Sequence, residues 1–147
     1  MRRVMTALIA LGVIAVGASL VYAQSAAIGQ RQAILKTFGG AMKDPGGMLK
    51  GEIPFDLAKV QASLKVLAEG APKLKDLFPD DSQSGAATEA LPAIWANKAD
   101  FVARFDKLAA DATAATTAIK DEASFKAEWP KLGGNCGGCH KTYRKPS

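Results

Sequence analysis

The sequence Cys136-Gly137-Gly138-Cys139-His140 ends seven residues before the C-terminus. Cys-x-x-Cys-His is the attachment sequence of c-type haem. On a helix, positions three and four apart lie on one face, so both thiols can form thioethers with the two vinyl groups of one porphyrin. The imidazole of His140 projects from the same face and can take an axial position on the iron. The chain has no other cysteine or histidine, so the sequence predicts one covalently attached haem c, with its iron and one histidine ligand.

Other uses of this motif fit the sequence less well. A thioredoxin-like redox pair lies in a βαβ pattern, and no alternating strand pattern precedes the motif. A structural zinc ion needs four protein ligands, whereas the motif supplies three. A disulfide between Cys136 and Cys139 would close almost no loop and constrain little.

The N-terminus has the pattern of an export signal. A short basic segment is followed by an apolar run, Val4–Leu20, and by small residues ending at Ala23. We therefore expect residues 1–23 to be a cleaved signal peptide and residues 24–147 to be the mature haem domain. The alternative is a retained anchor, because the run is nearly long enough to span a bilayer. Export agrees with the motif, since bacteria attach c-type haem outside the cytoplasmic membrane, and it predicts a periplasmic protein that does not associate with the membrane after cleavage.

The positive charge of the chain is modest. The formal net charge is +5, and removing Arg2 and Arg3 with the signal lowers it to +3. No arginine-rich stretch with interleaved aromatic residues supports nucleic-acid binding. We expect no nucleic-acid partner.

Four amphipathic helical patterns follow the signal, with apolar residues at spacings of three and four. The proline and glycines at positions 45–47 are expected to end the first helix, a polar segment at positions 79–90 reads as an exposed crossover loop, and Pro130 is expected to kink or loosen the last helix. This pattern predicts an all-α, antiparallel four-helix bundle with the haem attached near the C-terminus. The expected helices are Ala26–Lys43, Asp56–Gly70, Pro92–Ile119, and one from Asp121 through the haem motif.

Several segments besides the motif are similar to one family. The haem motif lies at the extreme C-terminus within Asn135–Arg144, and Lys50–Asp56 resembles the family's turn between its first two helices. Leu77–Pro79 and the later Ile94-Trp95 resemble its crossover and the start of its third helix. Over essentially all of residues 24–147, the chain resembles the class II cytochromes c, most closely cytochrome c′, a four-helix bundle.

The resemblance implies roles for further residues. Aligning on the turn after the first helix places Leu35 at the distal position, where it cannot ligate iron. Arg31 and Gln32, one turn earlier, match residues that bond the haem propionates. Arg144, one turn after His140, matches a basic residue that flanks the proximal pocket.

The sequence leaves two coordination states of the iron open. An apolar residue at position 35 implies a five-coordinate haem, whereas low-spin relatives of the c556 type place a methionine on the iron. Met42 lies about 10 Å further along the helix than Leu35, at 1.5 Å per residue, so one haem cannot meet both. Met48, in the glycine-rich turn, has a weaker claim.

The expected function is that of a periplasmic cytochrome that transfers electrons with donor and acceptor proteins and binds small diatomic gases such as nitric oxide and carbon monoxide. The resemblance also implies a homodimer formed through the first two helices. The alternative is a low-spin electron carrier with histidine and methionine ligands. A haem enzyme, such as a peroxidase or nitric oxide reductase, is less favoured because peroxide chemistry commonly uses a second histidine or an arginine to move protons, and the chain has no second histidine. We expect no enzymatic activity.

Overall fold

The structure, a computed structural model, describes residues 2–84 and 86–146, with side chains described from residue 26 onward. The predicted export signal, residues 1–23, therefore falls outside the part whose side chains are described. The elements in chain order are α1 (Arg2–Lys50), α2 (Leu57–Gly70), the 3₁₀ turns η1 (Ala71–Leu74) and η2 (Asp80–Gln83), α3 (Ala93–Ala96), α4 (Lys98–Ala118) and α5 (Glu122–Tyr143).

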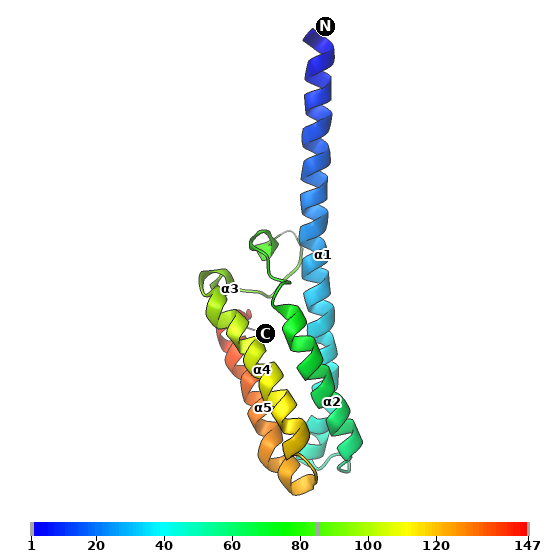
Figure 1. Cartoon of the computed structure of the whole chain (residues 1–147), viewed down its shortest axis with the longest axis vertical. Helices are drawn as coiled ribbons and strands as arrows, with labels where there is room; N and C mark the ends of the chain where they lie inside the picture. The colour runs from blue at the N-terminus through cyan, green and yellow to red at the C-terminus, as the bar shows by residue number, and fades with distance from the viewer. Residues whose placement is uncertain (1, 85, 147) are drawn as a thin grey trace.

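The four long helices form one bundle (Figure 1). α1 packs on α2, α2 on α4, and α4 on α5, whereas α1 and α5 make at most slight contact over the described residues. The described part contains no β-strand, only an isolated bridge between Ala90 and Arg144. The predicted all-α four-helix bundle is confirmed.

The core is apolar and rich in aromatic rings. Phe101 packs edge-on against Phe78, Phe105 and Tyr143, with ring centroids 4.6–5.1 Å apart, a geometry that aromatic pairs prefer. At the other end of α5, Trp129 lies beside another buried ring and is 2% exposed. The contact between Phe101 and Tyr143 joins α4 to α5 at the C-terminal end of the chain.

Glycine is required where α1 and α2 approach most closely. A Cβ built on Gly70 would lie 2.4 Å from Cε1 of Phe38. Only a residue without a side chain fits there, so this glycine sets the close contact between the two helices.

The predicted helix starts at Asp56 and Asp121 are confirmed. The Asp56 carboxylate accepts the backbone N–H of Lys59, and Asp121 accepts that of Ser124. Ser124 Oγ in turn accepts the backbone N–H of Asp121, which completes a capping box at the start of α5.

The predicted end of the first helix is wrong by about seven residues. α1 continues through Pro45 to Lys50. It ends at Gly51, whose φ of +73° suits glycine. The N–H of Glu52 bonds to the carbonyl of Gly47 at 2.9 Å, and that of Gly51 to Met48 at 3.1 Å, which is a Schellman ending.

Two other interruptions also differ from the prediction. The predicted third helix is divided at Asn97, whose backbone leaves the helical region at φ −128° and ψ 46°, while its side-chain amide donates to the carbonyl of Ala93. Such local side-chain bonds compete with helix geometry. Conversely, α5 runs unbroken through Pro130, held by Trp129 and Leu132, which are at most 2% exposed.

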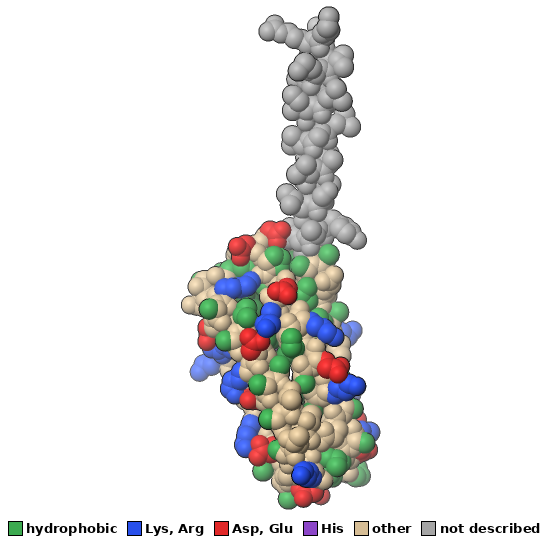
Figure 2. Space-filling view, viewed as in Figure 1, with side chains coloured by type: hydrophobic (Ala, Val, Ile, Leu, Met, Phe, Trp, Pro, Cys, Tyr) green, Lys and Arg blue, Asp and Glu red, His purple; other side chains and the backbone are tan. Residues whose placement is uncertain are grey.

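The surface of the bundle carries both signs of charge. On the face shown in Figure 2, Lys and Arg side chains alternate with Asp and Glu over the described residues. Among the residues whose side chains the structure describes, no helix has both the length and the apolar character that crossing a bilayer requires.

Candidate haem-binding site

The two cysteines and the histidine of the motif lie on one face of the last turns of α5. Cys136 and Cys139 are unpaired and half-buried, and Cys139 packs against the core. Burial raises the pKa of both thiols, which keeps them protonated at neutral pH. The thiols are therefore held at the edge of the apolar interior and remain accessible from the surface.

His140 follows on the same face and is exposed. The pKa of its imidazole is lowered by partial burial and then by the nearby positive charge of Arg144, while Glu89 opposes the shift. A lowered pKa favours the neutral imidazole, which is the form that ligates a metal. The environment of this side chain thus suits an axial ligand.

On α1, Leu35 is a large apolar side chain that is only partly covered by the rest of the protein. It is 39% exposed, which is more than the other large apolar side chains among the described residues. It lies four residues after Arg31 and three before Phe38, both of which are buried, so it borders the inward face of α1.

Arg31 is 2% exposed and is bound by the crossover segment. Its guanidinium donates to the carbonyls of Leu77 and Ser82 at 3.2 and 3.1 Å, to Ser82 Oγ at 2.8 Å and to Thr88 Oγ1 at 3.1 Å. It also lies over the ring of Phe78, 4.5 Å from the centroid, a favourable cation–π geometry. The role that the resemblance implies for Arg31, bonding a propionate, stays a prediction.

The crossover segment, residues 79–90, was expected to be an exposed loop. In the structure, hydrogen bonds from side chains of α1 hold it against that helix. Ser82 is fully buried, and the exposed Gln32 donates from its amide to the carbonyl of Ala87 at 2.8 Å. Many residues of the segment are exposed as predicted. The two α1 residues that the resemblance assigned to the haem propionates both contact this segment.

Thr88 and Glu89 connect the two halves of the candidate site. Thr88 Oγ1 accepts a hydrogen bond from the Arg31 guanidinium, and Arg144 Nε donates to Glu89 Oε2 at 2.6 Å. The Arg144 guanidinium lowers the pKa of the Glu89 carboxyl. Sequence reasoning missed both residues, because their partners lie more than fifty positions away.

The methionines considered as ligands lie deeper than Leu35. Met42 is partly buried and packs against the core, and Met48 is 4% exposed.

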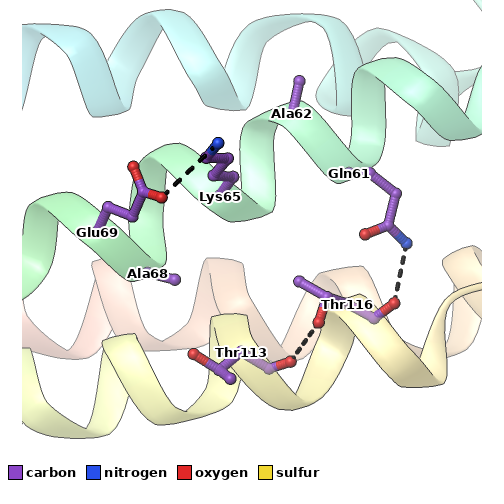
Figure 3. A pocket seen from close by; sticks show the side chains of 7 residues that line it. All are labelled: Gln61, Ala62, Lys65, Ala68, Glu69, Thr113 and Thr116. Atoms are coloured by element: carbon purple, nitrogen blue, oxygen red, sulfur yellow. Dashed lines mark hydrogen bonds and ion pairs between the residues drawn. The ribbon is translucent and has the colours of Figure 1, made fainter.

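A groove on another face of the bundle contains none of the predicted site residues (Figure 3). It lies between α2 and α4, and its polar feature is Gln61, whose amide donates to the carbonyls of Thr116 and Ile119 at 3.0 Å each. Lys65 and Glu69 pair with each other along its rim at 3.8 Å. The Gln61 bonds tie α2 to the C-terminal end of α4, whereas the Lys65–Glu69 pair lies within α2.

The residues present fit a haem group. Two accessible thiols and one imidazole on a single helical face are the donor set that c-type attachment needs. A Cβ at Gly137 would meet no atom within 4 Å, so the helix surface is open at this position between the cysteines. On α1, Leu35 is a partly exposed apolar side chain.

Comparisons with known proteins agree with this reading. The family profile described as Cytochrome C' matches residues 26–144. A cytochrome c′ of Rhodopseudomonas palustris is 50% identical over 90% of this chain and 91% of that protein. A cytochrome c-556 of Agrobacterium fabrum is 38% identical over 97% of this chain and 94% of that protein.

A solved structure of cytochrome c′ from Rhodopseudomonas palustris superposes with a TM-score of 0.81 at 52% identity, covering 82% of this chain and 97% of that one. The profile match extends over the whole bundle and the haem motif. Haem c with its iron is the cofactor of this family, and electron transport is its general role. The chain belongs to the cytochrome c′ family.

Proposed function

We propose that this protein is an exported cytochrome that transfers single electrons and binds neutral diatomic gases such as nitric oxide and carbon monoxide at a five-coordinate haem. The observation that carries the proposal is Leu35, an apolar side chain at the inward edge of α1 that is 39% exposed. A leucine has no atom that can ligate iron, so it leaves the sixth position open.

Each side chain of the site has a role in this proposal. The thiols of Cys136 and Cys139 form the two thioethers, and His140 is the axial ligand. Arg144 flanks the imidazole, held by its ion pair with Glu89. When bound, the haem supplies a redox-active iron whose potential depends on its ligand, its burial and its hydrogen bonds.

Leu35 also determines which molecules are admitted. It has no hydrogen-bond donor to stabilise bound dioxygen, and an apolar surface disfavours anions because they would lose their hydration. Nitric oxide and carbon monoxide carry no charge and do not depend on such a donor. One turn before Leu35 on α1, Arg31 and Gln32 are placed by the crossover segment, and we propose that they would bond the propionates.

A low-spin electron carrier with a methionine ligand is the second candidate. The similarity to cytochrome c-556 favours it, and Met42 is the methionine that shares a face with Leu35. We place it second because Met42 packs against the core. An enzymatic role is not part of the proposal, because the chain has no second histidine to move protons.

The proposal includes export to the periplasm, with residues 1–23 removed and no membrane association afterwards. The exported protein then begins at Gln24, which its intact mass would show. We also propose a homodimer through α1 and α2, and periplasmic proteins as electron donors and acceptors.

The experiment that tests the proposal is a carbon monoxide titration of the reduced protein and of Leu35→Ala. Shortening this side chain relieves the crowding that an incoming gas must overcome, so the affinity is expected to rise about tenfold or more. Leu49→Ala is the matched control, since Leu49 lies on the same helix about 20 Å away at 1.5 Å per residue and packs on the core. An unchanged affinity in Leu35→Ala would contradict the distal assignment.

A further inference from the structure

A row of charged residues on α4 faces the haem-attachment segment of α5, residues Asn135–Tyr143. The proposed function gives these charged residues no role. Asp100, Arg104, Lys107 and Asp111 are spaced by four, three and four residues, so they form one stripe along the helix. α4 and α5 lie side by side (Figure 1). Three members of the stripe bond directly to α5.

The first contact lies at the C-terminal end of the attachment segment. Tyr143, three residues after His140 and 4% exposed, donates its hydroxyl to Asp100 Oδ2 at 2.5 Å. The same oxygen accepts Nε of Arg104 at 2.8 Å. The ring of Tyr143 packs on Phe101, so both the ring and the hydroxyl are fixed by α4.

The second contact lies within the motif itself. Arg104 Nη1 donates to the backbone carbonyl of Gly138 at 2.9 Å, between the two cysteines. Its guanidinium also lies 5.1 Å from the ring centroid of Tyr143. One arginine therefore joins Asp100, the tyrosine and the motif backbone, which its planar, multiply donating group allows and a lysine would not.

The third contact lies immediately before the motif. Asn135, the residue preceding Cys136, donates its amide to Asp111 Oδ2 at 2.7 Å. Lys107 bonds the same oxygen at 2.5 Å. The attachment segment is therefore held before the first cysteine, between the cysteines, and after the histidine.

We propose that Asp100, Arg104 and Asp111 are positioning residues for the haem: they hold Asn135–Tyr143 of α5 so that the two thiols and the imidazole are fixed relative to the rest of the bundle. This inference rests on the proposed roles of the motif residues. α5 needs such support because Gly137 and Gly138 weaken it at this point, since mid-helix glycine is destabilising. An attachment helix that moved would change the orientation of the axial imidazole.

The test uses the haem-bearing protein with Arg104→Gln, which removes the donors to both Asp100 and Gly138. We expect the backbone amides of residues 136–143 to exchange hydrogen about two- to fivefold faster, while those of Val60–Leu67 in α2 remain unchanged. We also expect a changed iron–histidine vibration in the reduced protein, because that signal reports the orientation of the imidazole. Arg104→Lys should restore neither the slow hydrogen exchange nor the original iron–histidine vibration, because one ammonium group cannot span both acceptors.

Two further variants keep the test decisive. Tyr143→Phe removes one hydroxyl without changing the charge or the ring packing. We expect it to accelerate hydrogen exchange at residues 136–143 less than Arg104→Gln does. Asp106→Asn is the matched control, because it breaks an ion pair of the same helix, with Lys75 at 2.7 Å, that does not involve α5.

The results that would contradict the positioning role differ from those that would contradict the proposed haem attachment. Exchange unchanged at residues 136–143 in Arg104→Gln, or accelerated equally in α2, would overturn the positioning role. If the unsubstituted protein carried no covalently bound haem, as judged by its mass, the proposed attachment residues would be wrong instead.

Discussion

At the scale of single residues, the most constrained side chain outside the haem motif is Arg31. A fully buried arginine is costly unless its donors are satisfied, and here it has four hydrogen bonds and an aromatic ring beneath it. Its four acceptors include the carbonyls of Leu77 and Ser82. The residue therefore fixes the crossover segment to α1, whatever contact it makes with a propionate.

Replacing Arg31 by leucine should be strongly destabilising. It would leave buried acceptors without a donor, at an expected cost of about 2–4 kcal/mol in the free energy of unfolding, measured by urea denaturation. Gln32→Ala is the matched control: it removes one exposed hydrogen bond to the same segment and should cost no more than about 0.5 kcal/mol. Equal losses in the two variants would show that Arg31 does not anchor the segment.

At the scale of elements, α5 combines a strong beginning with a weak middle. Its first turn has the capping box of Asp121 and Ser124, whereas its later turns contain Pro130 and two glycine pairs. Buried Trp129 and Leu132 carry the helix across this region. Tertiary contacts therefore outweigh the local preferences, as they commonly do.

The cap of α5 should make stability depend on acid. Bonds from the Ser124 side chain and then its backbone N–H lower the pKa of Asp121 below the ordinary 3.8. The carboxylate therefore contributes stability that is present above 3.8 and is lost as the pH falls through the lowered value. Asp121→Asn keeps a capping oxygen but cannot titrate.

We expect the melting temperature of Asp121→Asn to lie slightly below that of the unsubstituted protein at neutral pH. The gap should close or reverse as the pH falls from neutral to below 3.8. The measurement is thermal unfolding of both proteins across this range, with Asp56→Asn, the other capping aspartate, as a comparison. Parallel curves would contradict the role of the cap.

The helix ends show what could be predicted locally. Asp56, Gly70 and Asp121 were predicted correctly because capping and stop signals act on their immediate neighbours. The end at Pro45 and the continuous third helix through Asn97 were wrong. Burial of Met48 beyond Pro45 and the backbone geometry at Asn97 depend on packing and side-chain bonding that spacing does not encode.

At the scale of the whole molecule, the candidate site is assembled from three segments. α5 supplies the motif, α1 supplies Leu35 and Arg31, and the crossover joins them through Thr88 and Glu89. The motif could be recognised from sequence because its residues are adjacent. Glu89 and Arg104 could not, because each looks like an ordinary surface charge until the fold places it beside α5.

The central claim is an open sixth iron position over Leu35, and an optical spectrum of the purified protein, oxidised and then reduced with dithionite, tests it most directly. We predict a broad, high-spin Soret band in the reduced protein and no sharp α band. Sharp, split α and β bands, together with a weak thioether–iron charge-transfer band in the oxidised protein, would contradict the claim. They would identify a methionine ligand and a low-spin electron carrier.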